Sequence, residues 1–241
     1  MSAPLPVLNS APAPPAAGTP GPLRTGILDV PPDRLRAWLA DRRQPPMRVA
    51  QVRRQVLARR AESFDQMSDL PKELRADLDQ AFTVFTTRVE RHLIATDDTH
   101  KLVLRLPDDK LIECVLIQDE GRATACVSTQ VGCGMGCVFC ASGLNGVVRN
   151  LSVGEILEQL VRLRNLVGVR GPTPGPQDSP PLGGPQQRLT HIVVMGMGEP
   201  LANLDHLLEA LAVAGDKNGL GIGARLPGPR ARPSWEARSS D

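Results

Sequence analysis

The spacing of apolar residues along this chain predicts helices first and strands later. In residues 31–86 apolar positions recur every three or four residues, which is typical of amphipathic helices. We predict one helix that begins at Pro31, a second at 47–61 and a third that begins near Pro71. Their buried faces would carry Leu35, Trp38 and Leu39, then Val49, Val52, Val56 and Leu57, then Leu74, Leu78 and Phe82. We assign residues 23–95 to a small helical domain.

Leucines then alternate at 102, 104 and 106, and an apolar segment at 111–117 follows a turn at 107–110, which predicts a β-hairpin over residues 101–117. Glu113 and Cys114 lie inside the return strand. An acid in an apolar strand either lies on the exposed face or has a function, and the exposed position is the commoner one.

The rest of the pattern predicts a parallel α/β arrangement in residues 101–225. A short strand at 123–129 leads to a loop and then to a helix, for which Ser152 and Glu155 form a capping box. Residues 189–195 contain consecutive apolar residues, as in a buried parallel strand, and a further helix follows. Asn203 or Asp205 would cap that helix.

Three segments lack any periodicity and are rich in Pro and Gly. Residues 1–22 are predicted to be a disordered leader, and residues 168–188 a surface loop that is long for a compact domain. Residues 226–241 are predicted to be a disordered tail in which the α/β pattern stops.

The charge is uneven although the net charge is only +2. Arginine supplies 24 of the 28 basic residues, and nine arginines but one acid lie between Arg34 and Arg60. Such a helical face could hold a phosphate backbone. An ordinary solvated surface of an arginine-rich protein explains the charge equally well.

Cysteine supplies the strongest chemical signal in the chain. Three of the five cysteines, Cys133, Cys137 and Cys140, lie within eight residues. Thiolates are soft ligands, and three at this spacing favour an iron–sulfur cluster with one open iron over a structural zinc site or an inert buried set. The odd count opposes a secreted disulfide framework. With no signal peptide and no membrane-spanning run, we expect a reducing, cytoplasmic location.

A second candidate site follows the apolar run at 189–195. Residues 195–199 read Met-Gly-Met-Gly-Glu and would lie at the carboxyl end of a parallel strand, where ligands collect in α/β folds. The glycines would let a ligand meet the backbone, and Glu199 could accept from an amine or a hydroxyl group. The alternative is a simple turn into the next helix.

The cysteine motif with an aromatic residue before its last cysteine, together with Gly-Glu-Pro at 198–200, resembles radical S-adenosylmethionine enzymes. Longer matches resemble their RlmN/Cfr branch, which methylates adenine in large-subunit ribosomal RNA and, for RlmN, some transfer RNAs. These matches are Ala-Cys-Val-Ser-Thr-Gln-Val-Gly-Cys at 125–133, Arg-Asn-Leu at 149–151 and Gly-Met-Gly-Glu-Pro-Leu-Ala-Asn at 196–203. Residues 47–70 are similar to the family's N-terminal RNA-binding region.

The resemblance implies the fold, the cofactors and several residue roles. The segment after the hairpin would begin a partial (βα)6 TIM-like barrel. Cys133, Cys137 and Cys140 would bind a [4Fe–4S] cluster, while Gly198 and Glu199 would contact S-adenosylmethionine. Glu113 matches the family's proton acceptor, which overturns the exposed-face preference. Cys126 matches a cysteine that can form a disulfide with a methyl-carrying cysteine and help release the product.

The implied function is methylation of adenine C2 in 23S rRNA and possibly in tRNA, by a monomer that takes electrons from a donor such as flavodoxin. The alternatives are C8 methylation, as in Cfr-like members, and a non-catalytic RNA-binding remnant. No cysteine follows Cys140, and the family match stops near Arg225. We therefore expect a C-terminally truncated family member with an aberrant tail, which should not transfer a methyl group by itself.

Overall fold

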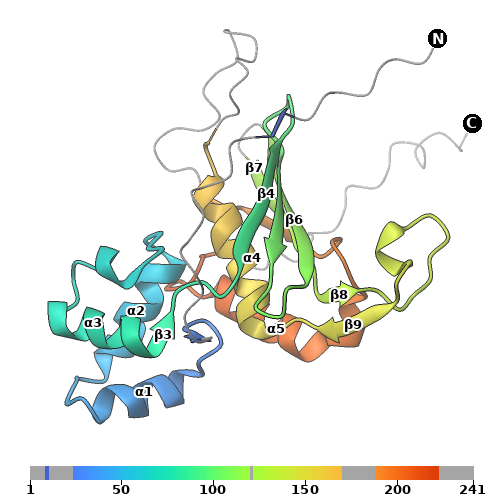
Figure 1. Cartoon of the computed structure of the whole chain (residues 1–241). Helices are drawn as coiled ribbons and strands as arrows, with labels where there is room; N and C mark the ends of the chain where they lie inside the picture. Colours follow the sequence, from blue (N-terminus) through green and yellow to red (C-terminus); the bar gives the residue numbers. More distant parts are fainter. Residues whose placement is uncertain (1–8, 11–23, 120–121, 170–187, 223–241) are drawn as a thin grey trace, which may run out of the picture.

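The computed structural model describes residues 9–10, 24–119, 122–169 and 188–222, and they form a helical domain and a mixed β-sheet with a central helix between them (Figure 1). The predicted tail at 226–241 and most of the predicted leader and long loop lie outside these residues. Within the leader, Asn9–Ser10 forms β1 and pairs with β4. In the part of the chain that is described, no helix is both long and apolar enough to cross a membrane.

The helical periodicity produces three helices, α1 (Pro32–Ala40), α2 (Met47–Leu57) and α3 (Lys72–Ala81). The short helix η1 (Phe64–Gln66) and the parallel strands β2 (Thr25–Gly26) and β3 (Phe82–Thr83) complete the domain. The predicted inward face is confirmed, because every named aliphatic residue on it is buried. Two predicted helix ends are wrong: α2 stops at Leu57, before Arg60 turns to a φ of 63°, and Phe82 lies in β3.

The sheet contains six strands in the order β1-β4-β5-β6-β7-β10. The predicted hairpin is confirmed as β5 (His100–Arg105) and β6 (Leu111–Asp119). The predicted range of the helical domain, 23–95, is too long, because it includes the sheet strand β4 (Arg88–Ile94). The pairing of β4 with β5 shifts register between Val89 and Arg91. The apolar residues of β4 therefore do not alternate regularly in the sequence.

The predicted parallel pair is also confirmed. Strand β7 (Arg122–Cys126) pairs with β10 (His191–Val193) in parallel, and all other neighbours in this sheet are antiparallel. Between them lie a short hairpin, β8 (Gln130–Gly132) and β9 (Val147–Asn150), and α4 (Val153–Leu166). After β10 come η3 (Pro200–Asn203) and α5 (Leu204–Gly215), which packs on α4.

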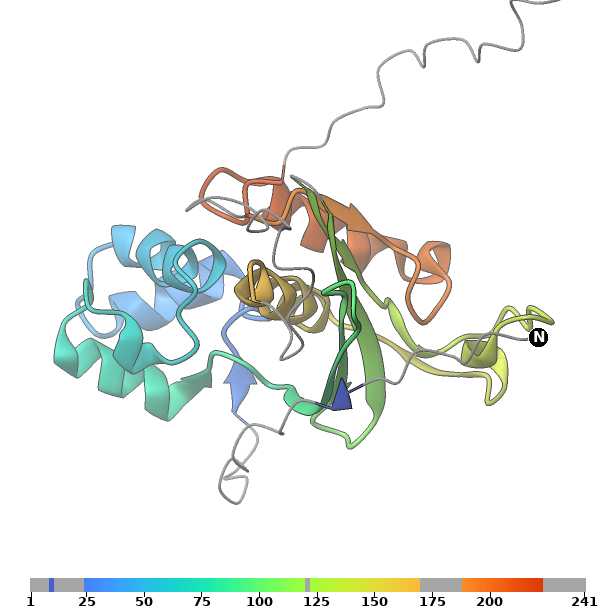
Figure 2. The same ribbon diagram turned by 90° about the horizontal axis from the view of Figure 1, so that it is seen from above.

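Helix α4 is the central element of the fold. In both views it lies between the helical domain and the sheet (Figures 1 and 2). The predicted capping box is present at its start: Ser152 Oγ accepts from Glu155 N at 3.1 Å, and Glu155 Oε2 accepts from Ser152 N at 2.9 Å. Ten of its residues are buried, including Glu158, Gln159 and Arg164. The helix therefore holds both halves of the molecule together through polar as well as apolar contacts.

A histidine pair at the far end of the sheet makes stability depend on pH. His92 Nε2 and His100 Nδ1 share a hydrogen bond of 2.8 Å, and His100 Nε2 donates to Val169 O at 2.9 Å. Burial lowers the pKa of both imidazoles. In the unfolded chain the histidines have a pKa of about 6.5. As the pH falls, the unfolded chain therefore binds protons at a higher pH than the folded chain does.

We expect the contribution of the neutral histidine pair to the free energy of unfolding to be complete above about pH 6.5. This contribution should be lost as the pH falls below that value. Urea unfolding of the wild type and of His100→Gln between pH 5 and 8 measures the difference. The wild type should lose more stability on acidification than the variant does. Equal losses would show that the pair does not titrate in this way.

Candidate functional site

The three clustered cysteines lie on the loop of the β8–β9 hairpin, residues 133–146. Cys133 N donates to Gly146 O at 3.0 Å and closes the base of this loop. Gly132 has a φ of 77°, and a Cβ there would overlap Gly146 O, so the close crossing requires glycine. The loop projects away from the sheet on the side opposite the helical domain in both views (Figures 1 and 2).

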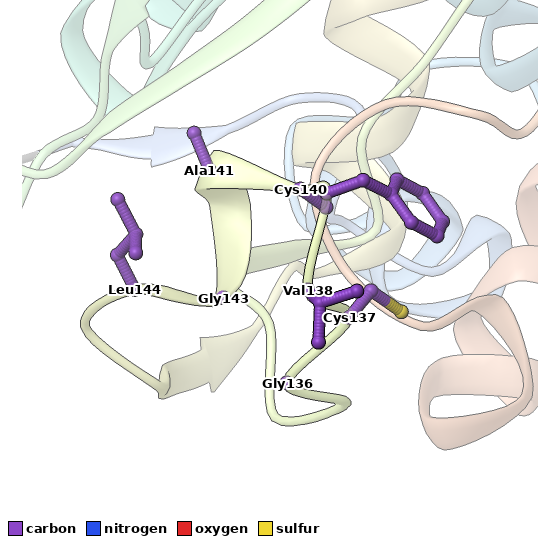
Figure 3. A pocket seen from close by; sticks show the side chains of 8 residues that line it. Gly136, Cys137, Val138, Cys140, Ala141, Gly143 and Leu144 are labelled. Carbon is purple, nitrogen blue, oxygen red and sulfur yellow. The ribbon is translucent and has the colours of Figure 1, made fainter.

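Two of the thiols line a pocket of about 390 Å³ within this loop. Cys137 and Cys140 line this pocket together with Gly136 and Gly143. Figure 3 shows that Ala141 and Leu144 point away from the side on which the two cysteines lie. Cys133 is buried, Cys137 is exposed and Cys140 is partly buried. Hydrogen bonds from the backbone and side chain of Ser142 lower the pKa of Cys140, which favours its thiolate.

These residues suit an iron–sulfur cluster by their donor chemistry. Three soft thiols lie on one short loop, and its glycines leave the backbone close to the pocket. Among the described residues, however, no three His, Cys, Asp or Glu side chains lie close enough together to hold a metal ion. A cluster would therefore require the exposed Cys137 and the other two thiols to converge.

The predicted glycine-rich turn lies directly beside the base of the cysteine hairpin. Gly196 N donates to Val127 O at 3.1 Å, and Met197 O accepts from Thr129 N at 2.8 Å. Glu199 is the N-cap residue of η3, and its Oε1 accepts from Leu201 N at 3.2 Å. The Gly-Glu turn is thus attached to the base of the hairpin that carries the cysteine motif.

Close packing explains why Gly198 is a glycine. Its φ is 103°, and a Cβ would lie 2.6 Å from Gln130 Cβ and 2.7 Å from Gln130 N. Gly136 also has a positive φ, 61°, but a Cβ there would meet nothing within 4 Å. The first glycine is therefore constrained by backbone conformation and by space, the second by conformation alone.

We expect Gly198→Ala to lower the free energy of unfolding by about 2 kcal/mol and Gly136→Ala by about 1 kcal/mol. Both values come from urea unfolding of the reduced chain without iron, so that cofactor binding does not contribute. Equal losses in the two variants would mean that the contact with Gln130 does not restrict position 198.

Glu113 and Cys126 lie on the face of the sheet that points away from α4. In the register Val115 pairs with Cys126, and Glu113 is two residues earlier on the same face of β6. Glu113 Oε2 forms an ion pair with Lys101 Nζ at 2.7 Å, and its side chain is 45% exposed. It is therefore both accessible and partnered, which fits either alternative given for it above.

Cys126 is half-buried, and burial raises the pKa of its thiol. All five cysteines are free thiols, so the disulfide implied for Cys126 is not present in this structure. Cys114 is fully buried on the opposite face, and burial raises its pKa strongly. Cys114 is thus an inert core residue, while Cys126 reaches the open face.

Four polar residues that organise the site were not identified from the sequence. Arg149 binds Asp108 and Glu155 through both pairs of carboxylate oxygens, at 2.8 to 3.2 Å, and ties β9 to α4 and to the β5–β6 turn. Gln130 and Asn150 connect the hairpin to the Gly-Glu turn. Their signal in the sequence was their place in the segments at 125–133 and 149–151, which resemble the RlmN/Cfr branch.

The fourth residue, Asn203, corrects a prediction. It is the N-cap residue of α5 by position, but its side chain makes no capping hydrogen bond. Its Nδ2 instead donates to Thr129 O at 2.8 Å and to Leu151 O at 2.9 Å, on the two sides of the cysteine hairpin. Asn203 therefore stabilises the site and not the helix end.

The class of protein is given by a solved structure that shares this fold. The solved structure of a radical SAM methyltransferase from Sphaerobacter thermophilus has a TM-score of 0.70 and 33% sequence identity, over 83% of this chain and 55% of that one. Residues 25–84 match the family described as the ribosomal RNA large subunit methyltransferase N-terminal domain.

Two curated proteins narrow the assignment. The probable dual-specificity RNA methyltransferase RlmN of Rhodopirellula baltica is 47% identical over 205 residues, which is 85% of this chain and 51% of that protein. RlmN 3 of Opitutus terrae is 45% identical, over 79% of this chain and 51% of that protein. The chain belongs to the RlmN family. It spans about half the length of the curated relatives it matches.

Proposed function

We propose that this chain carries the RNA-binding and cluster-binding parts of a radical S-adenosylmethionine methyltransferase that acts on adenine C2 in 23S rRNA, with tRNA as a second substrate. The observation that carries the proposal is the packing of the Gly-Glu turn against the base of the cysteine hairpin, where Thr129 N and Gln130 N donate to Met197 O, at the carboxyl ends of the parallel strands β7 and β10. The two curated relatives described above are named as probable dual-specificity RNA methyltransferases, which supports RNA as the substrate class.

Each site residue has a defined part in this proposal. Cys133, Cys137 and Cys140 would hold a [4Fe–4S] cluster, which when bound supplies the electron that cleaves S-adenosylmethionine. The carboxylate of Glu199 would bind the amino group of that cosubstrate beside Gly198. Glu113 would take the proton from the adenine on the open face of the sheet, where Cys126 also lies.

The helical domain would bind the RNA backbone. Arg34, Arg43 and Arg54 are exposed, and none of them forms an ion pair with any residue that the structure describes. Since this domain and the cysteine loop lie on opposite sides of the sheet and α4, a bound RNA would have to extend along the molecule to reach both (Figure 2). We further propose that β7, α4, β10 and α5 are the first units of a TIM-like barrel, in a cytoplasmic protein that accepts electrons from a flavodoxin-like donor.

Anaerobic reconstitution with iron and sulfide tests the cluster. We expect broad visible absorbance and about four irons per chain, and an altered electron paramagnetic resonance signal of the reduced cluster when S-adenosylmethionine is added. Zinc binding without iron, or a cluster that does not respond to S-adenosylmethionine, would contradict the proposal.

RNA binding is tested with fragments of 23S rRNA and with tRNA at several salt concentrations. We expect affinity to fall with salt, and the triple variant Arg34→Gln, Arg43→Gln, Arg54→Gln to bind more weakly and with a smaller salt slope. The unrelated surface substitution Arg122→Gln, in a residue paired with Asp119, is the matched control. Unchanged binding by the triple variant would contradict this part of the proposal.

A further inference from the structure

Gln130 touches both of the segments to which cofactor binding is assigned above. It lies on β8, three residues before Cys133, and it is buried. Its Oε1 accepts a hydrogen bond from Glu199 N at 2.9 Å, and its Nε2 donates to Asn150 Oδ1 at 2.8 Å. Its Cβ occupies the space into which a side chain at Gly198 would project. One side chain therefore contacts the two residues proposed to bind S-adenosylmethionine.

The second strand of the cysteine hairpin extends the same arrangement. Asn150 on β9 accepts from Gln130 and donates from Nδ2 to Ala202 O at 3.0 Å. The backbone N of Gln130 also donates to Met197 O at 3.2 Å. The turn from Met197 to Ala202 is thus attached to both strands that carry the cysteine loop, through a connected set of amide groups.

We infer that Gln130 is a positioning residue that fixes the backbone of Glu199, and with it the carboxylate, relative to the cysteine loop. The inference rests on the proposed function, because only that function gives the Glu199 carboxylate a ligand. The backbone N of Glu199 donates to Gln130, while its carboxylate accepts from the nearby Leu201 N and from no other group that the structure describes. Without Gln130 the direction of the carboxylate would no longer be set by the strand that leads to Cys133.

The physical basis is preorganisation. A group that is already oriented before a ligand binds loses less conformational freedom on binding, so affinity falls when its support is removed. Supports of this kind around metal sites typically contribute about 10-fold to 100-fold to affinity or activity. The effect expected here is on the affinity for S-adenosylmethionine, and not on the cluster, because the Gln130 side chain contacts none of the three cysteines through a hydrogen bond in the described structure.

Two substitutions separate positioning from simple packing. Gln130→Met keeps the side chain over Gly198 but removes both hydrogen bonds, whereas Gln130→Glu keeps an oxygen that can accept from Glu199 N. The matched control is Gln118→Met. Gln118 is also buried and accepts from a backbone amide, Gly168 N at 2.8 Å, but it lies at the opposite end of the sheet.

The reconstituted proteins are compared by iron content, by equilibrium dialysis with S-adenosylmethionine and by the resonance signal of the reduced cluster. We expect wild-type iron content in all of them, about tenfold weaker S-adenosylmethionine binding by Gln130→Met, and a smaller loss in Gln130→Glu. Gln118→Met should lose stability but bind as the wild type does.

The outcomes are distinguishable. If the wild type binds S-adenosylmethionine and Gln130→Met binds it equally well, the inference fails while the proposed function stands. Loss of iron in Gln130→Met would also overturn it, since Gln130 would then support the cluster itself. If the wild type takes up no cluster or no S-adenosylmethionine, the proposed function fails and the inference fails with it. If Gln130→Met does not fold, Gln130→Glu decides: a loss of S-adenosylmethionine affinity at wild-type iron content that Gln118→Met does not show supports the inference, and wild-type affinity overturns it.

Discussion

Replacing Cys137 with alanine is expected to abolish iron binding by the reconstituted chain. Cys137 is the middle thiol of the motif and is exposed on the loop, so its removal should leave the fold intact. Two remaining thiols cannot hold a [4Fe–4S] cube that requires a thiolate on each of three irons. Iron should fall from about four per chain to almost none, as measured by iron assay and visible absorbance.

Cys114→Ala is the matched control for this experiment. Cys114 is buried in β6 on the face toward α4, where it makes none of the contacts of the cysteine loop. Its removal should cost about 1 kcal/mol of stability and leave the iron content unchanged. Full iron content in Cys137→Ala, or equal losses in the two variants, would show that the motif does not hold the cluster.

Among the substitutions considered, Glu158→Ala should lower the free energy of unfolding most, by about 3 kcal/mol. This carboxylate on α4 is completely buried and accepts from Thr86 N at 2.6 Å, Thr86 Oγ1 at 2.7 Å and Thr87 N at 2.9 Å. Alanine would leave the Thr86 and Thr87 N–H groups without their acceptor, and the partly buried charge of Arg162 without the nearby negative charge. Urea unfolding of the reduced chain without iron measures the loss.

Asp33→Ala is the comparison for an exposed acid. Asp33 pairs with Arg36 at 2.6 Å, but its side chain is 89% exposed, so the loss should stay below about 0.5 kcal/mol. Glu158→Gln, which keeps one acceptor oxygen, should fall between the two. A loss in Glu158→Ala as small as that in Asp33→Ala would mean that the linker between β3 and β4, residues 84–87, does not depend on this carboxylate.

These contacts fix the helical domain to the sheet. Arg162 on α4 donates to Thr87 Oγ1 at 2.9 Å and to Thr87 O at 2.6 Å, and Arg164 donates to Val56 O at 2.9 Å. Asp29 accepts from Gly154 N at the start of α4 at 2.7 Å. The proposed RNA-binding face is therefore held at a set position relative to the cysteine loop.

The periodic elements of this fold could be predicted from the sequence because each records its own environment. Residues such as Leu35, Val52 and Leu78 recur at the helical spacing, and the alternation of 101–117 gave the hairpin and its turn. Strand β4 could not be predicted in the same way, since its register shift breaks the alternation and only pairing with β5 makes it a strand. Phe82 was placed in a helix because its spacing fits one, whereas pairing with β2 decides its conformation.

By itself the sequence determined the amphipathic helices, the hairpin, the parallel α/β pattern and the chemistry of three thiols on one loop, because these depend on residues close together in the chain. Only the tertiary structure decided that the cysteine hairpin packs on the Gly-Glu turn, that Gly198 makes room for Gln130, and that Glu158 clamps the linker before β4. These contacts join residues about 70 positions apart. Their hydrogen bonds depend on direction and distance in space, and no local spacing of residue types encodes either.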